Sequence, residues 1–241
     1  MHWQVFLWLL SLRVLITAPI SKKTPAKRFS KEFAEGASYA ISTRHIRFII
    51  LFVAGLTLVG VSYMVVLPVF AADVFDGGAV IFGYMTSAVG IGSLIGAVFV
   101  GTKRNALGLD KLILLGTVLF AFGLAIFSFS TILWISLLAL VTTGLGRVIV
   151  FTGSNTLLQT ISPDEKRGRV LSFYIMLFMG SLSLGSFLIG LVSDWVGAPL
   201  TVFFGSIGVL LLAIYYAKSL PLLRKRTYRA IKKSELIWER N

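Results

Sequence analysis

The residue types that carry most enzyme chemistry are scarce in this chain. It has no Cys and only two His, His2 and His45. The lack of Cys excludes thiolate catalysis, a disulfide frame and Cys-ligated metal, and two His do not make a metal site. No Ser–His pair and no Asp-rich phosphotransfer motif occurs. We therefore expect a protein that is not an enzyme, with no catalytic residue, no metal and no cofactor.

A single charge interrupts the middle of a long apolar stretch. Arg147 follows residues 112–146, which carry no charge at all. A charge inside a bilayer costs at least ~2.5 kcal/mol on insertion scales, so the guanidinium must reach a cavity, a partner or the headgroups. Two interpretations stay open: a substrate or gating role, and snorkelling to the cytoplasmic interface. Farther along, Asn155 and Gln159 either line a cytoplasmic mouth or hydrogen-bond the next loop.

Membrane helices must position these residues. The chain is 56% hydrophobic and 14% charged, with a mean hydropathy of +0.88. About 20 apolar residues are needed to cross the hydrocarbon core as a helix. Six stretches qualify, residues 48–72, 82–100, 112–127, 132–152, 170–192 and 200–217. They contain no Asp or Glu, which weighs against autonomous proton antiport. We predict an all-α polytopic membrane protein.

Lys and Arg alternate between the gaps that separate these spans. Seven, three, three and eight of the 23 lie in segments 19–47, 103–111, 166–169 and 218–241, and the other gaps have none. By the positive-inside rule these segments and the C-terminus are cytoplasmic, in a multi-pass protein of the cell membrane, while Asp73, Asp76 and Asp194 face outside. Topology and anionic lipid thus explain the net charge of +13, so we do not expect nucleic-acid binding.

The flanking segments have their own patterns. Residues 1–18 are apolar but contain Arg13 and no A-x-A cleavage site. We expect a transmembrane helix or the remnant of one, with an interfacial segment as the alternative. Residues 19–47 read as a basic cytoplasmic linker with a surface amphipathic helix near 29–41, or as a plain solvated linker. Residues 48–217 form the bundle, and 218–241 a basic cytoplasmic tail.

Glycine is concentrated in the second and fifth spans. Small residues let helix backbones approach closely or slide, and Gly92-x-x-x-Gly96 has the spacing of a packing face. We expect either static packing or a moving interface at these positions. The residues concerned are Gly90, Gly92, Gly96, Gly180, Gly185 and Gly190.

Parts of the chain resemble a known family. The runs NTLLQTISPDEKRGRVLSFY (155–174) and LPVFAADVFDGGAVIFGYMTSAVGIGSLIGA (67–97) resemble the C-terminal half of major facilitator superfamily exporters of the enterobactin-exporter and macrolide-efflux type. EFAEGASYAISTRHIR (32–47) looks like the surface helix before that half. The most specific part is a cytoplasmic loop motif made of Pro163, Asp164, Glu165, Arg167, Gly168 and Arg169.

The resemblance implies an architecture and a mechanism. The six spans would be helices seven to twelve of a transporter, and residues 1–18 the end of helix six. Two bundles would rock about a midplane site, with the Gly-rich spans, helices eight and eleven, as moving contacts. The N-terminal half is missing, and Lys103 and Arg104 are a degenerate remnant of the superfamily's basic loop motif. We therefore expect a half-transporter with a separate N-terminal six-helix half, or else a non-transporting fragment or assembly partner.

The resemblance also implies a ligand. We expect efflux of an amphipathic organic solute, drug-like or siderophore-like, by alternating access through a weakly polar cavity. The expected partners are the lipid bilayer, this solute and the other half. The candidate cavity residues are Tyr63, Met64, Tyr84, Arg147 and Asn155.

Overall fold

The computed structural model describes the backbone of residues 38–102 and 108–238, and the side chains of these ranges as far as Leu220. Contacts divide the chain into two units, Met1–Glu35 and Gly36–Asn241, and described residues occur only in the second. The predictions for residues 1–18, for most of the 19–47 linker and for Lys103 and Arg104 lie outside the described residues. Within the described ranges all regular structure is helical.

Six helical segments are long and apolar enough to cross a membrane. An apolar helix is stable in lipid because its backbone hydrogen bonds are all internal. The prediction of an all-α polytopic fold with six spans is therefore confirmed. The segments are Arg44–Val74, Gly78–Gly101, Leu109–Phe129, Leu133–Ile161, Asp164–Val196 and Ala198–Leu220.

Most helices extend beyond the apolar runs that reveal them. The helices are α5 (Gly78–Gly101), α6 (Leu109–Phe129), α7 (Leu133–Ile161), α8 (Asp164–Val196) and α9 (Ala198–Trp238). Polar residues continue a helix outside the hydrocarbon core until a turn residue ends it. Between α7 and α8 this residue is Pro163, which has an extended backbone and precedes the first residue of α8.

The first span is not one continuous α-helix. It consists of α3 (Arg44–Val59), the 3-10 turn η1 (Val61–Val65), the short α4 (Leu67–Val69) and the π turn η2 (Phe70–Val74). Pro68 lacks the N–H that an α-helix would direct at the Met64 carbonyl, and 3-10 and π turns are common where the regular ladder is interrupted. At Gly60 a Cβ would lie 2.7 Å from the side chains of Phe120 and Val209. The lack of a side chain at Gly60 therefore lets the end of α3 lie close to α6 and α9.

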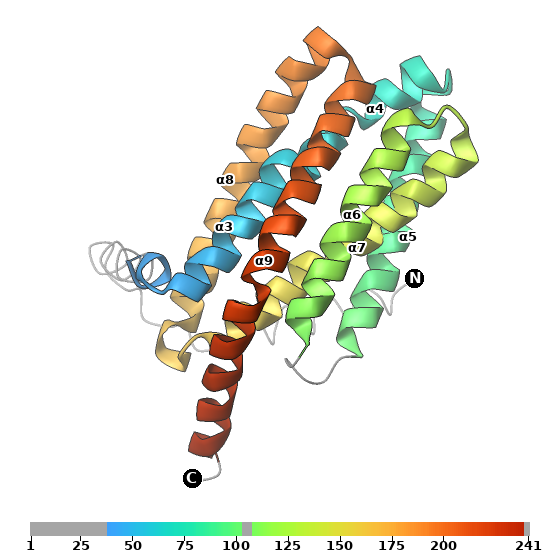
Figure 1. The fold of residues 1–241 in the computed structure, drawn as a ribbon. Coiled ribbons are helices and arrows are strands. Elements are labelled where there is room, and N and C mark those ends of the chain that lie inside the picture. Colours follow the sequence, from blue (N-terminus) through green and yellow to red (C-terminus); the bar gives the residue numbers. More distant parts are fainter. Residues whose placement is uncertain (1–37, 103–107, 239–241) are drawn as a thin grey trace, which may run out of the picture. The chain divides into compact units, whose positions relative to one another are not determined.

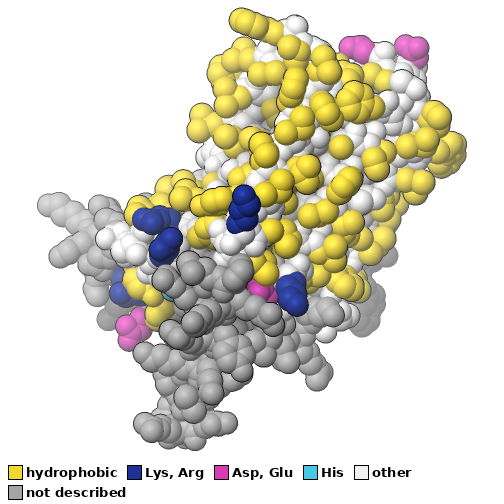
Figure 2. Space-filling model, in the orientation of Figure 1, with side chains coloured by type: hydrophobic (Ala, Val, Ile, Leu, Met, Phe, Trp, Pro, Cys, Tyr) yellow, Lys and Arg dark blue, Asp and Glu magenta, His cyan; other side chains and the backbone are white. Residues whose placement is uncertain are grey.

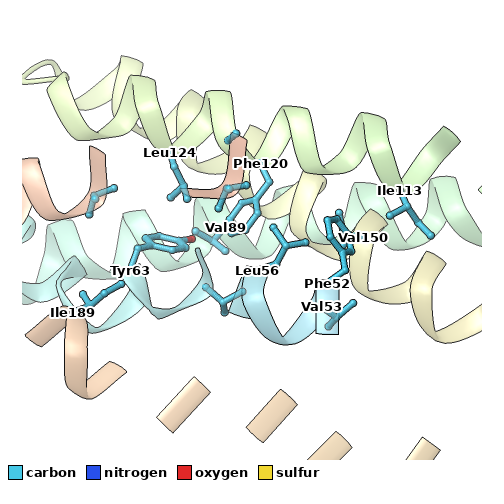
Figure 3. Close-up of a cluster of buried hydrophobic side chains, with 14 of the residues drawn as sticks. Phe52, Val53, Leu56, Tyr63, Val89, Ile113, Phe120, Leu124, Val150 and Ile189 are labelled. Atoms are coloured by element: carbon cyan, nitrogen blue, oxygen red, sulfur yellow. The ribbon is translucent and has the colours of Figure 1, made fainter. Parts of the chain in front are cut away.

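The helices pack around a shared apolar core. α7 lies between α5 and α6, α9 lies against α6 and α3, and α8 packs mainly on α3 (Figure 1). Figure 3 shows buried side chains from several of these helices directed toward one another, among them Phe52, Leu56, Phe120 and Leu124. The ring centroids of Phe52 and of Tyr216 on α9 lie 4.6 Å apart. This core joins α3, α6, α7 and α9.

Charged side chains gather at the two ends of the bundle. At one end, Asp73 and Asp76 lie near the connection between η2 and α5, and Asp194 lies near the connection between α8 and α9. Figure 2 shows acidic side chains at the upper end, apolar side chains over the faces below it, and the visible Lys and Arg side chains, with further acidic ones among them, toward the opposite end. Among the described residues visible there, Lys and Arg thus gather toward one end of the bundle, whereas acidic side chains occur at both. Which end is cytoplasmic stays a prediction.

Candidate functional site

Glycines hold α7 tightly between its neighbours. A Cβ at Gly144 would overlap the backbone carbonyl of Val89 on α5. A Cβ at Gly146 would lie 2.5 Å from the Gly116 carbonyl oxygen and the Phe120 nitrogen on α6. Backbone atoms of packed helices cannot move aside as a side chain can. These contacts on both sides fix the rotation of α7 about its own axis. This rotation in turn fixes the direction in which the next side chain, that of Arg147, leaves the helix.

The facing surface of α5 is built in the same way. A Cβ at Gly92 would overlap the Val141 carbonyl, and one at Gly96 would lie 2.8 Å from the Leu145 carbonyl oxygen. Both glycines therefore allow the close approach of α5 and α7 in this structure. Gly185 of α8 allows a similar approach to the first span, since a Cβ there would overlap the Leu58 carbonyl and the Ser62 hydroxyl.

The other predicted glycines are in a different situation. Gly90 on α5 and Gly180 and Gly190 on α8 have nothing within 4 Å of an added Cβ. No described residue packs there. Their role in a moving interface stays a prediction, and these three are the positions where another backbone could still approach.

Arg147 lies at the midpoint of α7, fourteen residues from Leu133 and from Ile161, or about 21 Å from either end. Its Nη1 lies 3.2 Å from the Sδ of Met64, and its Nη2 donates to the Ser93 hydroxyl at 3.4 Å. Ser93 in turn donates to the Val89 carbonyl at 2.7 Å. One half-buried guanidinium thus connects η1, α5 and α7.

The direction of the side chain bears on the two interpretations of Arg147. α7 continues nine residues past the predicted end at Thr152, so Arg147 lies farther from the helix end than expected. The guanidinium reaches across to Met64 and Ser93 instead of along α7. Snorkelling would require the side chain to extend along α7 toward the end of the helix. The geometry favours the ligand or gating interpretation.

Aromatic residues adjoin the contacts of Arg147. Tyr63 precedes Met64 in η1, is 1% exposed, and has a hydroxyl with no hydrogen-bond partner among the described residues. Phe151, one turn from Arg147, packs edge-on against Phe178 of α8 with ring centroids 5.0 Å apart. The site therefore combines one cation with apolar surface.

The structure brings together some of the predicted cavity residues and not others. Met64 and Arg147 are in contact, and Tyr63 is the residue before Met64 in η1. Tyr84 is nine residues before Ser93, about 13 Å along α5 and on its opposite side. Asn155 is eight residues past Arg147, about 12 Å along α7. Tyr84 and Asn155 thus belong to other parts of the bundle.

Sequence reasoning missed two polar residues. Ser93 is one of many small residues in the second span, and its position next to Gly92 is the only signal that places it at the α5–α7 contact. Asp110 lies outside the predicted third span, which begins at Leu112. In the structure α6 begins at Leu109, and Asp110 is 7% exposed with an Oδ2 that has no hydrogen-bond partner among the described residues. The predicted third span itself contains no Asp or Glu, and Asp110 belongs to α6 because this helix begins three residues before that span.

The predicted loop motif forms the start of α8. The backbone N–H groups of Lys166 and Arg167 both donate to the Pro163 carbonyl at 2.9 Å. Arg167 pairs with Asp164 at 2.6 Å and donates from Nε to the Gln159 carbonyl of α7 at 2.9 Å. These contacts tie the last turn of α7 to the first turn of α8. The motif thus has a structural role at the basic end of the bundle.

Comparison with known proteins assigns the family. Residues 4–236 match the transmembrane secretion effector family of the major facilitator superfamily. The chain belongs to this family. The resemblance noted in the sequence is therefore confirmed.

Two curated relatives are similar over part of their lengths. A D-xylose transporter of Levilactobacillus brevis is 28% identical over 102 residues, which cover 42% of this chain and 22% of the relative. A staphyloferrin A transporter of Staphylococcus aureus is 30% identical over 138 residues, covering 57% and 34% respectively. The matches therefore span about a fifth to a third of these relatives.

Proposed function

We propose that this family member exports an amphipathic organic solute, drug-like or siderophore-like, by alternating access. The observation that carries the proposal is the contact of Arg147 with Met64 and Ser93, which places one cation at the middle of the bundle between η1, α5 and α7. Charges at such depth are rare and usually functional. The two relatives are both transporters by name, one of a sugar and one of a siderophore.

The proposed motion uses two features of the fold. The 3-10 and π turns in the first span are a point where the helix can bend, and such turns often mark hinges. The open positions at Gly90, Gly180 and Gly190 offer a surface on which a second bundle can approach and slide. Transport then follows from different solute affinities in the inward-open and outward-open states.

The proposed transporting unit includes a second six-helix bundle. The relatives extend well beyond the matched regions, and superfamily transporters place their site between two such halves. The second bundle can come from the same polypeptide or from a separate one. The basic ends of the helices face the cytoplasm of the cell membrane in this proposal, as does the C-terminus.

The test of export uses cells that keep the native locus intact. They are loaded with fluorescein, an anionic dye, or with rhodamine 6G, a cationic one, and dye loss is followed over time. We expect at least one dye to leave faster than from a strain in which this reading frame is deleted. Equal retention of both dyes in the two strains would support the non-transporting alternative instead.

A second test addresses sidedness. Because the chain has no Cys, single cysteines at two exposed positions, Gly168→Cys and Asp194→Cys, can be labelled selectively. We expect a membrane-impermeant maleimide to label Asp194→Cys in intact cells and Gly168→Cys only after permeabilisation. Labelling of both in intact cells would contradict the proposed orientation.

A further inference from the structure

We propose that Arg147, with Ser93 and Met64, binds an oxyanion, a carboxylate or a phosphate, carried by the transported solute. This inference rests on the proposed export function and narrows the solute to an amphipathic organic anion. Three observations support it: the lack of a counter-ion among the described residues, the fixed position of the guanidinium, and the apolar groups beside it.

The Arg147 charge is not neutralised within the described part of the chain. No carboxylate there pairs with it, and its partners are a thioether, a weak acceptor, and one neutral hydroxyl. A guanidinium remains charged and has five N–H donors in a planar fork. The buried Asp110 is no substitute. Gly146 packs on α6 at Gly116 and Phe120, six and ten residues, or about 9 and 15 Å along the helix, from Asp110, and the Arg147 guanidinium points to Met64 and Ser93. Donors are therefore left for an incoming oxyanion.

The guanidinium is held where it is before any ligand arrives. The Ser93 hydroxyl donates a hydrogen bond to the Val89 carbonyl at 2.7 Å, so its oxygen presents lone pairs to Nη2 of Arg147. The glycine contacts on both sides of α7 set the backbone that carries Arg147. A positioned fork loses little further conformational entropy on binding, which favours recognition of a planar or tetrahedral oxyanion.

The neighbours of Arg147 are apolar and suit an organic body. The Met64 side chain is in contact with Nη1 and is 38% exposed. Phe151 and Phe178 form an edge-on aromatic pair one helical turn away. A thioether and aromatic rings give adaptable apolar contact. An amphipathic anion can thus pair its charged group with Arg147 and lay its apolar part on this surface, whereas a cation would be repelled.

The experiment compares acids with their neutral amides. The full chain is purified in phosphatidylcholine nanodiscs, and binding of benzoate, 4-phenylbutyrate and dodecanoate is measured by isothermal titration calorimetry beside the corresponding amides. We expect at least one acid to bind about tenfold more tightly than its amide, in line with a hydrogen-bonded charge pair. Arg147→Gln should remove this preference. Lys111→Gln, which removes an exposed positive charge at the start of α6, should keep it.

Two further variants guard against loss of folding in Arg147→Gln. Arg147→Lys keeps the charge without the fork and should retain a reduced preference for the acid. Ser93→Ala removes only one hydroxyl and should lower acid affinity about threefold while leaving amide affinity unchanged. Equal binding of every acid and its amide, no binding of any acid, or an acid preference that survives Arg147→Gln would overturn the inference.

A last arm separates a solute from a lipid headgroup. The titrations are repeated in nanodiscs that contain phosphatidylglycerol. Acid affinity that is unchanged by this lipid supports a solute site. Competition by the lipid that weakens in Arg147→Lys and disappears in Arg147→Gln would assign the oxyanion to a headgroup and overturn the proposal. Dye export without any acid preference leaves the export function standing and rejects the oxyanion site. Acid preference without dye export supports the oxyanion site and rejects the export function.

Discussion

α7 and α8 are consecutive apolar helices of 29 and 33 residues, yet they are held very differently. In their most apolar stretches 44% of the α7 residues are buried inside the bundle, but only 11% of the α8 residues. α7 is enclosed by α5 and α6 with backbones in contact at glycines, whereas α8 packs mainly on α3. Similar hydropathy therefore leads to one fixed helix and one largely free helix.

The difference assigns separate tasks to the two helices in the proposed mechanism. A cation at the centre of the bundle must be positioned accurately to be useful, and the helix that carries it is held on two sides by backbone contacts at glycines. A helix that moves against a partner needs a small, open face, and α8 has Gly180 and Gly190 on its surface with no described neighbour. Four substitutions test this contrast, from the largest expected effect to the smallest.

The first concerns the α5–α7 contact. Gly92→Ala should destabilise the protein by about 2–3 kcal/mol, because the added methyl overlaps the Val141 carbonyl and neither backbone can withdraw. Gly90→Ala, two residues away with open space, is the matched control and should be neutral or slightly stabilising. Reversible unfolding in mixed micelles measures both. Equal stabilities of the two variants would remove the argument that glycines fix α7.

The second concerns the α3–α8 contact. Gly185→Ala should cost about 1–2 kcal/mol, less than Gly92→Ala, because α8 is less enclosed than α7 and can shift away from Leu58. Gly180→Ala on the same helix serves as the control and should change stability little. The same unfolding assay applies. A larger loss for Gly185→Ala than for Gly92→Ala would reverse the comparison between α8 and α7.

The third separates motion from stability. Gly180→Leu should leave the stability of the chain almost unchanged, since no described residue lies within 4 Å of its Cβ. It should slow dye efflux severalfold if a second bundle slides over this face. Efflux and unfolding are measured on the same variant. Leu184→Ile, at an exposed residue one turn along the same face, conserves volume and is the control. Wild-type efflux in Gly180→Leu would contradict a moving interface at this residue.

The smallest effect is expected at the start of α8. Asp164→Asn removes the exposed ion pair with Arg167, whose two side chains are 78% and 43% exposed. Exposed pairs contribute about 0–1 kcal/mol, and an acid in the first turn adds a similar helix-dipole contribution. We expect a loss of less than about 1 kcal/mol that shrinks further in high salt. A loss comparable to that of Gly92→Ala would mean that this motif, and not the glycine contacts, holds α7 and α8.

The limits of prediction from sequence are visible at particular residues. Hydropathy located all six spans because a run of about 20 apolar residues is typical of a helix that crosses a bilayer and is rare elsewhere. The predicted fourth span ends at Thr152 and the fifth begins at Val170, whereas α7 continues to Ile161 and α8 begins at Asp164. A helix continues into the interface without any apolar signal. Hydropathy also could not distinguish Gly92 from Gly90, since their difference depends on which face of α5 meets Val141. The role of Ser93 escapes prediction for the same reason.

What the sequence determined by itself is the environment of the chain: apolar length, charge alternation and the loop motif are local properties that need no knowledge of helix rotation. What only the tertiary structure decided is which residues meet. Met64, Ser93 and Arg147 are far apart in the chain and come together only when α5 and α7 pack at their glycines and the first span breaks at Gly60. Helix rotation and backbone approach are set by packing across helices, and no single stretch of sequence contains that information.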